Sequence, residues 1–162
     1  LFYLFIFTST LTFAGDYVLL RKQFDGACAE EKKAVALLSA LTAVKNPDPV
    51  STGYCHATEA VMARYNSNPM LRYRMCKTGL DKLNETITIH PSSLELHYLR
   101  FALESNIPSF LGLSGHLDED KKMILKMIPT SKDADLNKRI AAFLMENKSC
   151  TPEEVQSLKC YR

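Results

Sequence analysis

The sequence lacks an excess of charge of either sign. Its 162 residues include 20 lysines and arginines against 18 aspartates and glutamates, which gives a formal net charge of +2. Proteins that bind nucleic acid usually carry a clustered basic surface, whereas the charges here alternate in sign along predicted helices, as on solvated helical faces. The composition therefore argues against nucleic acid as a partner.

Motifs that identify an enzyme or a cofactor site are also missing. The sequence has no nucleophile elbow, no glycine-rich phosphate loop, no HExxH segment and no CxxC pair, each of which would indicate a particular chemistry. His116, Asp118 and Asp120 can be imagined as metal ligands, but such a group at a predicted helix start is more typical of capping. We therefore name no catalytic residue and expect no cofactor and no metal.

Charge is absent from residues 1–14, LFYLFIFTSTLTFA, which are almost wholly apolar or hydroxylic. Small residues at Thr12 and Ala14, just before Gly15, match the cleavage site of a secretory signal peptide. The run is shorter than the roughly 20 residues that span a bilayer as a helix, so a retained anchor or a buried strand is the weaker alternative. Because an initiator methionine and a basic start are missing, we expect the chain to begin inside its reading frame.

Cleavage would leave a single domain, residues 15–162, which is long enough to bury a core. We expect export to the periplasm or cell envelope, or secretion, with no stable membrane span after cleavage. Export would place the cysteines in an oxidising compartment, and their odd number leaves at least one thiol free. The five are Cys28, Cys55, Cys76, Cys150 and Cys160. Their pairing stays open, because a helix between the last two would hold them too far apart for a disulfide unless it is short.

Most of the remaining chain shows helical periodicity. Turns rich in proline and asparagine separate six predicted helices, and a short seventh one follows near the C-terminus. Their approximate ranges are 25–44, 50–65, 69–87, 92–105, 117–128, 134–146 and 151–158. Residues 18–24 carry too many charges in too short a segment for an assignment.

The third predicted helix has the cleanest apolar seam in the chain, with steps of three and four residues typical of a buried helical face. The seam consists of Tyr73, Cys76, Leu80, Leu83 and Ile87. Gly79 lies beside it and would let another backbone approach closely. We therefore expect this helix to pack tightly against a neighbour, with Cys76 in the core.

The fourth predicted helix has two apolar faces, so we expect it at the centre of the fold. One face consists of Leu94, Tyr98, Phe101 and Ser105, and the other of Leu96, Leu99 and Leu103. Ser92 and Glu95 fit a capping box at its start. The loop that follows contains Phe110 and Leu111, and we expect these apolar residues to fold back onto the body.

A polar face on the same helix holds the residues that could carry chemistry. His97, Arg100 and Glu104 recur at i, i+3 and i+7, and such a group can bind a small anion or act in acid–base catalysis. The structural interpretation is that Arg100 and Glu104 pair along the helix, while Asp120 returns after the loop, pairs with Arg100 and pins the loop. We favour the structural interpretation.

Part of the chain resembles the boundary between two tetratricopeptide repeats. The matching positions are Gly79, Leu83, Thr86, Pro91 and the segment 92–98. The pattern then departs from the family at His97, where an aromatic residue is usual, and at Phe101, where glycine is usual. The resemblance covers about one repeat and implies tetratricopeptide-like helix pairing rather than a true array.

A longer resemblance spans about residues 54–125 and rests on six short pieces. They are Asn68-Pro69, Gly79-x3-Leu83-x3-Ile87, Pro91-x3-Glu95, Tyr98-Leu99-Arg100-Phe101, Ile107-Pro108-Ser109-Phe110-Leu111-Gly112 and Asp120-Lys121. In these pieces the chain is similar to a family of small, exported, uncharacterised proteins of Bacteroidetes-type bacteria. The resemblance implies an exported all-helical domain and implies no activity.

These observations predict an all-α protein of antiparallel helix pairs, arranged as a short tetratricopeptide-like solenoid or an irregular bundle of about six or seven helices. Its expected function is that of an exported, non-catalytic binding or scaffold module that holds a protein or peptide partner between helix pairs. The alternative is an enzyme or small-ligand binder that uses the face of His97, Arg100 and Glu104. Burial separates the two, because side chains paired inside the body argue against the enzyme, and side chains lining an open pocket with Asp120 argue for it.

Overall fold

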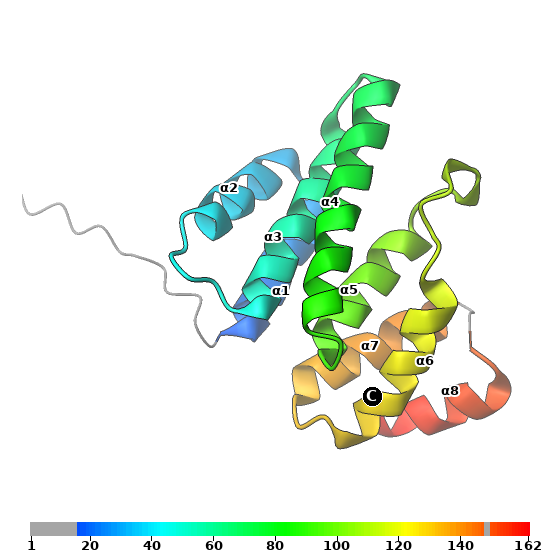
Figure 1. Ribbon diagram of the computed structural model, residues 1–162. Coiled ribbons are helices and arrows are strands. Elements are labelled where there is room, and N and C mark those ends of the chain that lie inside the picture. Colours follow the sequence, from blue (N-terminus) through cyan, green and yellow to red (C-terminus); the bar gives the residue numbers. More distant parts are fainter. Residues whose placement is uncertain (1–15, 148–149) are drawn as a thin grey trace, which may run out of the picture.

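The computed structural model describes residues 16–147 and 150–162, and these residues form helices and turns without any strand. The all-α prediction is confirmed (Figure 1), although the described residues hold eight α-helices where about six or seven were expected. They are α1 (Tyr17–Ala29), α2 (Glu31–Thr42), α3 (Pro49–Met62), α4 (Pro69–Ile89), α5 (Leu94–Ser105), α6 (Leu117–Met127), α7 (Ala134–Glu146) and α8 (Pro152–Leu158). The predicted signal segment 1–14 lies outside the described residues.

Four single turns of 3-10 helix extend or connect these elements. They are η1 (Ala63–Tyr65), η2 (Ser109–Leu111), η3 (Ile128–Thr130) and η4 (Lys159–Tyr161). Within the described part of the chain, no helix is both long and apolar enough to cross a membrane.

Proline-containing turns start three helices as the sequence indicates. Asp48 accepts hydrogen bonds from the backbone N–H groups of Val50 and Ser51 at the start of α3. Asn68 caps α4 in the same way, and Thr151 forms a complete capping box at α8 with Glu154. In each case proline occupies the first helical turn, where its missing N–H costs no hydrogen bond.

The N-terminal helices differ from the prediction. Residues 18–24, for which the sequence supports no assignment, form most of α1. The single helix expected over residues 25–44 is divided at Glu30, whose backbone is extended (φ −145°, ψ 126°). Two charged residues argue against a packed helix there, and one of them, Arg21, is 1% exposed and paired with carboxylates. A charged residue in a short segment indicates a solvated face only when it has no buried partner.

The capping box predicted at the start of α5 is also wrong. Ser93 rather than Ser92 caps the helix, and its hydroxyl accepts a hydrogen bond from the N–H of Leu96. Glu95 turns into the body instead, with Oε1 2.7 Å from Nε of Arg21. A hydrogen bond between two ionised groups is stronger than one to a neutral backbone amide, which favours this arrangement.

Helix α5 lies at the centre of the fold, as its two apolar faces predict. Leu96 and Leu99 belong to a core cluster built with α1, α2, α3 and α4. Phe101 belongs to a second cluster built with α6, α7 and α8. The helix therefore joins the two parts of a single body (Figure 1), and its polar side chains His97, Arg100 and Glu104 are buried.

The most extensive helix pairing is between α3 and α4, which lie side by side (Figure 1). Gly79 allows it, because a Cβ atom there would lie 2.5 Å from the backbone nitrogen of Ala60 in α3. Leu80, Leu83 and Ile87 of the predicted seam are buried against this contact. Tyr73 and Cys76, at the other end of the seam, are only partly covered.

A methyl group at position 79 tests this contact. We expect Gly79→Ala to lower the free energy of unfolding by about 2 kcal/mol, because the backbone of α3 must move to admit it. Urea denaturation followed by far-UV circular dichroism measures the loss. Thr78→Ala, on an exposed position of the same turn, should change stability by less than about 0.5 kcal/mol. Equal stability of the two variants would contradict the close approach.

Candidate functional site

The predicted polar face is buried and paired within the protein. Asp120, in the first turn of α6, is completely buried, and both its oxygens contact α5. Its Oδ2 lies 2.7 Å from Nε of Arg100, and its Oδ1 lies 2.7 Å from Nη2 of Arg100 and 2.6 Å from Nδ1 of His97. His97 and Arg100 are themselves 2% and 3% exposed. The predicted contact between Arg100 and Asp120 is therefore present, and it fixes α6 against α5.

The surroundings of His97 favour the protonated imidazolium. Nδ1 faces Asp120, and Nε2 lies 3.0 Å from the carbonyl oxygen of Pro91, so both ring nitrogens have an acceptor. A neutral imidazole carries one N–H and would leave one acceptor unsatisfied. Burial lowers the pKa of His97, but the hydrogen bonds to Asp120 and Pro91 outweigh it and raise the pKa above its ordinary value. The ring therefore holds its second proton more tightly than a free imidazole does.

Glu104 has a different partner from the one predicted. Its carboxylate does not form the expected ion pair with Arg100. It lies instead against His116, accepting a hydrogen bond of 2.8 Å from the backbone N–H and lying 2.7 Å from Nδ1. The backbone carbonyl of Glu104 also accepts a bond from the hydroxyl of Ser114. Glu104 thus holds the end of the 106–116 loop, because the backbone of that loop offers unpaired donors within its reach.

The residues considered as metal ligands are not brought together. Asp120 faces His97 and Arg100, and His116 faces Glu104. Across residues 16–147 and 150–162, no group of three or more histidines, cysteines, aspartates or glutamates is arranged to hold a metal ion.

A second buried cluster surrounds Arg21 and has no counterpart in the sequence prediction. The guanidinium makes two bonds to Glu95, of 2.7 and 2.9 Å, and further ion pairs to Asp133 (2.6 Å) and Asp135 (2.9 Å) at the start of α7. The hydroxyl of Tyr54 donates to Glu95 as well. Burial beside Glu95 raises the pKa of Tyr54 well above 10, so the phenol stays a neutral donor. Four helices, α1, α3, α5 and α7, meet at this cluster.

The described residues enclose a cleft with a volume of about 780 Å³. Its walls come from α1, α3 with η1, the first half of α4, α5, the loop at 106–113 and α7. Aromatic rings in edge-to-face contact form part of the lining, Phe24 with Tyr54 (5.3 Å between centroids) and Tyr98 with Phe143 (5.9 Å). This volume and this apolar lining are typical of binding clefts. The four residues of the predicted polar face do not contribute to it.

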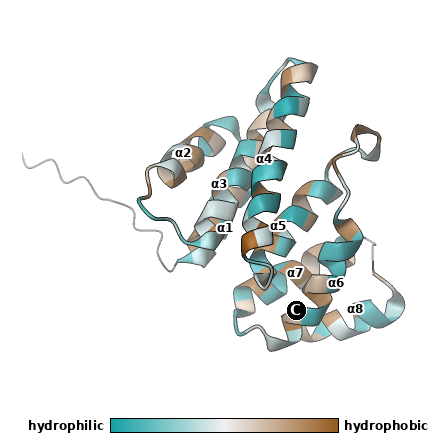
Figure 2. Cartoon of the chain, viewed as in Figure 1, coloured by the Kyte–Doolittle hydropathy of each residue, from teal (hydrophilic) through white to brown (hydrophobic). Residues whose placement is uncertain are grey.

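The loop beside the cleft does not fold back as predicted. Phe110, at its tip, is 84% exposed, while Leu111 is half-buried. Figure 2 shows this loop as a hydrophobic tip that stands clear of the helices. Gly112 takes a left-handed conformation (φ 66°) that closes the turn. The apolar residues of this loop are a local signal for the cleft in the sequence, because Phe110 and Leu111 both line it.

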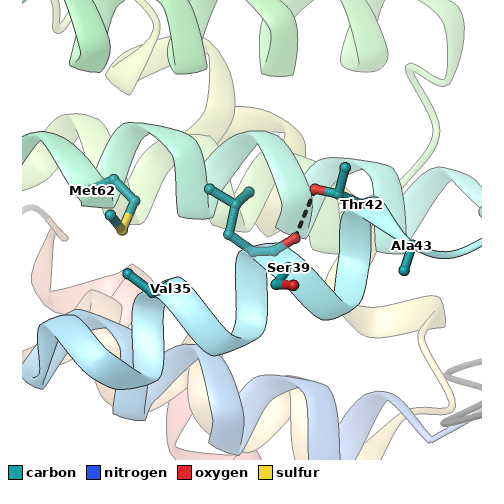
Figure 3. A pocket seen from close by; sticks show the side chains of 6 residues that line it. Val35, Ser39, Thr42, Ala43 and Met62 are labelled. Atoms are coloured by element: carbon teal, nitrogen blue, oxygen red, sulfur yellow. Dashed lines mark hydrogen bonds between the residues drawn. The ribbon is translucent and has the colours of Figure 1, made fainter.

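A second, shallower hollow lies between α2 and the end of α3. Figure 3 shows its lining, with Met62 of α3 opposite Val35 of α2. The hydroxyl of Thr42, on its edge, donates to the carbonyl oxygen of Leu38 within the same helix. The hollow has no charged side chain in its lining, so it offers less for specific recognition than the cleft.

Cys28, Cys55, Cys76 and Cys160 are free thiols. Cys28 and Cys76 line the cleft from α1 and α4, so Cys76 is not the fully buried core residue that its seam position predicts. Burial raises the pKa of Cys28 to about 11, although Arg64 opposes the shift. A thiol with a raised pKa is a poor nucleophile at neutral pH, and the pair contributes apolar lining.

No protein-family model, curated protein or solved structure matches this chain in the comparisons. The structure alone therefore defines the class of this protein, which is an all-helical bundle with an open apolar cleft.

Proposed function

We propose that the protein is a non-catalytic binding module that holds a peptide segment of a partner protein in the cleft. The observation that carries the proposal is the apolar surface at the mouth of the cleft, where Phe110 is 84% and Tyr73 37% exposed. Soluble proteins rarely leave large apolar side chains grouped around a hollow unless another molecule covers them. The helix pairing would then act as a tetratricopeptide-like scaffold, after export to the periplasm or cell envelope.

The form of the cleft suits a polypeptide. Helices form most of its walls, and side chains from α1, α4, α5 and α7 give several apolar positions along it. Grooves between helices commonly bind peptides by taking up a few apolar side chains in succession. The cleft lacks a convergent set of buried hydrogen-bonding groups, since Tyr54 and Arg21 in its lining are occupied by Glu95.

The alternative function, catalysis or small-ligand binding at His97, Arg100 and Glu104, has less support. Each of the three side chains is buried and bound to an internal partner. A catalytic acid or base must reach its substrate within hydrogen-bonding distance, and these groups lie outside the lining of the cleft. Their arrangement supports a structural role.

Selection of peptides tests the proposal. A random linear peptide library displayed on phage is selected against the purified protein, and the enriched peptides are measured by fluorescence anisotropy. We expect Phe110→Ser to weaken binding about tenfold, because an exposed aromatic anchor at the mouth is lost. The folded state should be unaffected, since the side chain is 84% exposed.

Ile89→Ser is the matched control. Ile89 is 72% exposed at the far end of α4 and does not line the cleft, so its loss should leave the affinity within about twofold. Failure to enrich any peptide would overturn the proposal. So would peptides whose affinity is lowered equally by the two variants or by neither.

A further inference from the structure

We infer that the segment held in the cleft is acidic, with carboxylates placed beside apolar or aromatic residues. The inference rests on the proposed binding function and specifies the chemistry of the partner. It follows from the charges that line the cleft and from which of them are already neutralised within the protein.

Four arginines and one aspartate are the charged residues in the lining. Arg21 is neutralised in its buried cluster, and Arg139 pairs with Asp25 (2.7 Å) and Asp135 (3.1 Å). Arg64 and Arg72 are left as the source of positive charge at the mouth. The cleft therefore presents a positive rim around an apolar interior.

The two rim arginines keep donors available for a ligand. Arg72 is exposed and forms no ion pair with any residue in the described ranges 16–147 and 150–162. Arg64 donates one hydrogen bond to the carbonyl oxygen of Cys28. A guanidinium carries five N–H donors, so this bond leaves most of the donors of Arg64 available.

The sequence around this rim reinforces the charge. The segment between Glu59 and Asp81 contains no acidic residue, although it includes four basic ones. They are Arg64, Arg72, Arg74 and Lys77. Lys77 pairs with Asp81 at 2.6 Å, and the other three lie nearer the start of α4, where the cleft opens. Their field is not cancelled by acidic neighbours in the chain.

Carboxylates are the groups that this rim would recognise in a polypeptide. The planar guanidinium fork binds a carboxylate through two parallel hydrogen bonds. Tyr73 and Phe110 lie at the same mouth and would cover apolar residues next to the carboxylate. A positive rim also attracts an acidic segment over distance and speeds its association, an effect that salt weakens.

Two designed peptides test the inference. Both carry fluorescein and the same phenylalanine and leucine residues, and they differ in having glutamate or lysine at every polar position. We expect the glutamate peptide to bind roughly tenfold more tightly at low salt, with the difference shrinking as salt is added. Fluorescence anisotropy measures both affinities.

Variants of two arginines on one helix locate the effect. Arg72→Glu should weaken the glutamate peptide roughly tenfold and strengthen the lysine peptide. Arg74→Glu is the control, since Arg74 is exposed on the same helix but does not line the cleft. Arg72→Lys keeps the charge without the fork, so it should give an intermediate loss. Equal effects at positions 72 and 74 would show a general field rather than recognition at the rim, and would overturn the inference.

The remaining outcomes separate this inference from the proposed function. If both peptides bind equally and both are weakened by Phe110→Ser, the cleft binds peptides but the acidic preference is wrong. If neither binds although the library yields peptides that do, the inference fails and the proposed function stands; if the library also yields none, both fail. Vesicles of phosphatidylglycerol form a third arm, and binding to them in place of the peptides, lost in Arg72→Glu, would identify a membrane-facing surface and overturn the inference.

Discussion

Arg21→Met is expected to lower the free energy of unfolding by about 4 kcal/mol. Methionine fills a similar volume, but it leaves the buried carboxylate of Glu95 without its cation, and breaking a buried ion pair from one side costs about 3–5 kcal/mol. Asp133 and Asp135 are partly exposed, so the loss of their ion pairs with Arg21 costs less, because water can replace the guanidinium. Urea denaturation followed by circular dichroism measures the change.

Two further variants make this expectation specific. Lys22→Met removes a neighbouring exposed lysine and should change stability by less than about 0.5 kcal/mol. The double variant Arg21→Met with Glu95→Gln should recover part of the loss, because the unpaired buried charge is gone. A stability of Arg21→Met equal to that of the wild type would show that Glu95 is not held as a buried anion.

The same cluster explains why part of the fold is hidden from the sequence. Periodicity identifies a helix when the buried residues are apolar, and this is how the ranges of α4, α6 and α7 follow from the sequence. In α1 a buried position is taken by Arg21, whose partners lie 74 to 114 residues away along the chain. Pairings at such a distance leave no local pattern. The helix therefore looks like a short charged segment until the whole chain is folded.

The candidate site shows a similar limit. His97, Arg100 and Asp120 could be grouped from the sequence because two of them share a helix face and the third follows a short loop. The sequence does not identify the true partner of Glu104. Helical spacing favours Arg100, whereas the folded loop brings His116 to Glu104. The sequence predicts a groove between helix pairs but not which residues line it, because the lining of the cleft comes from six parts of the chain.

The exposure of Phe110 illustrates why loops are hard to interpret. An apolar residue in a loop is compatible with packing onto the body and with projection from it, and the composition is the same in both cases. Here Glu104 fixes the C-terminal end of the loop through Ser114 and His116, and the tip that precedes them projects. Such apolar tips are where proteins contact other molecules.

Asp120→Asn is the second substitution with a large expected effect. We expect it to lower the free energy of unfolding by about 3 kcal/mol. The amide keeps the shape but removes the negative charge between two buried cations, His97 and Arg100, which leaves them uncompensated. Glu119→Gln is the matched control. Glu119 is its neighbour, contacts the same arginine at 3.3 Å and is 60% exposed, so its loss should cost less than about 0.5 kcal/mol.

The pH dependence of stability gives an independent readout of the same cluster. Because the pKa of His97 is raised in the folded protein, the folded state holds this proton more tightly than the unfolded state does. The resulting stabilisation is complete below the unfolded histidine pKa of about 6.5 and is lost as the pH rises through the raised folded value. We expect Asp120→Asn to flatten this slope, as His97→Gln should, whereas Glu119→Gln should retain it.

Binding measured on the same variant decides between the two roles considered for the polar face. Suppose that His97, Arg100 and Asp120 only join α5 to α6. The Asp120→Asn variant, kept folded at low temperature, should then bind the selected peptides with an affinity within about twofold of that of the wild type. The reason is that the cluster lies outside the lining of the cleft. A folded Asp120→Asn protein that has lost the peptides would place the polar face in ligand binding and contradict the structural role. Loss of stability with retained affinity assigns the three residues to the architecture that holds the cleft in place.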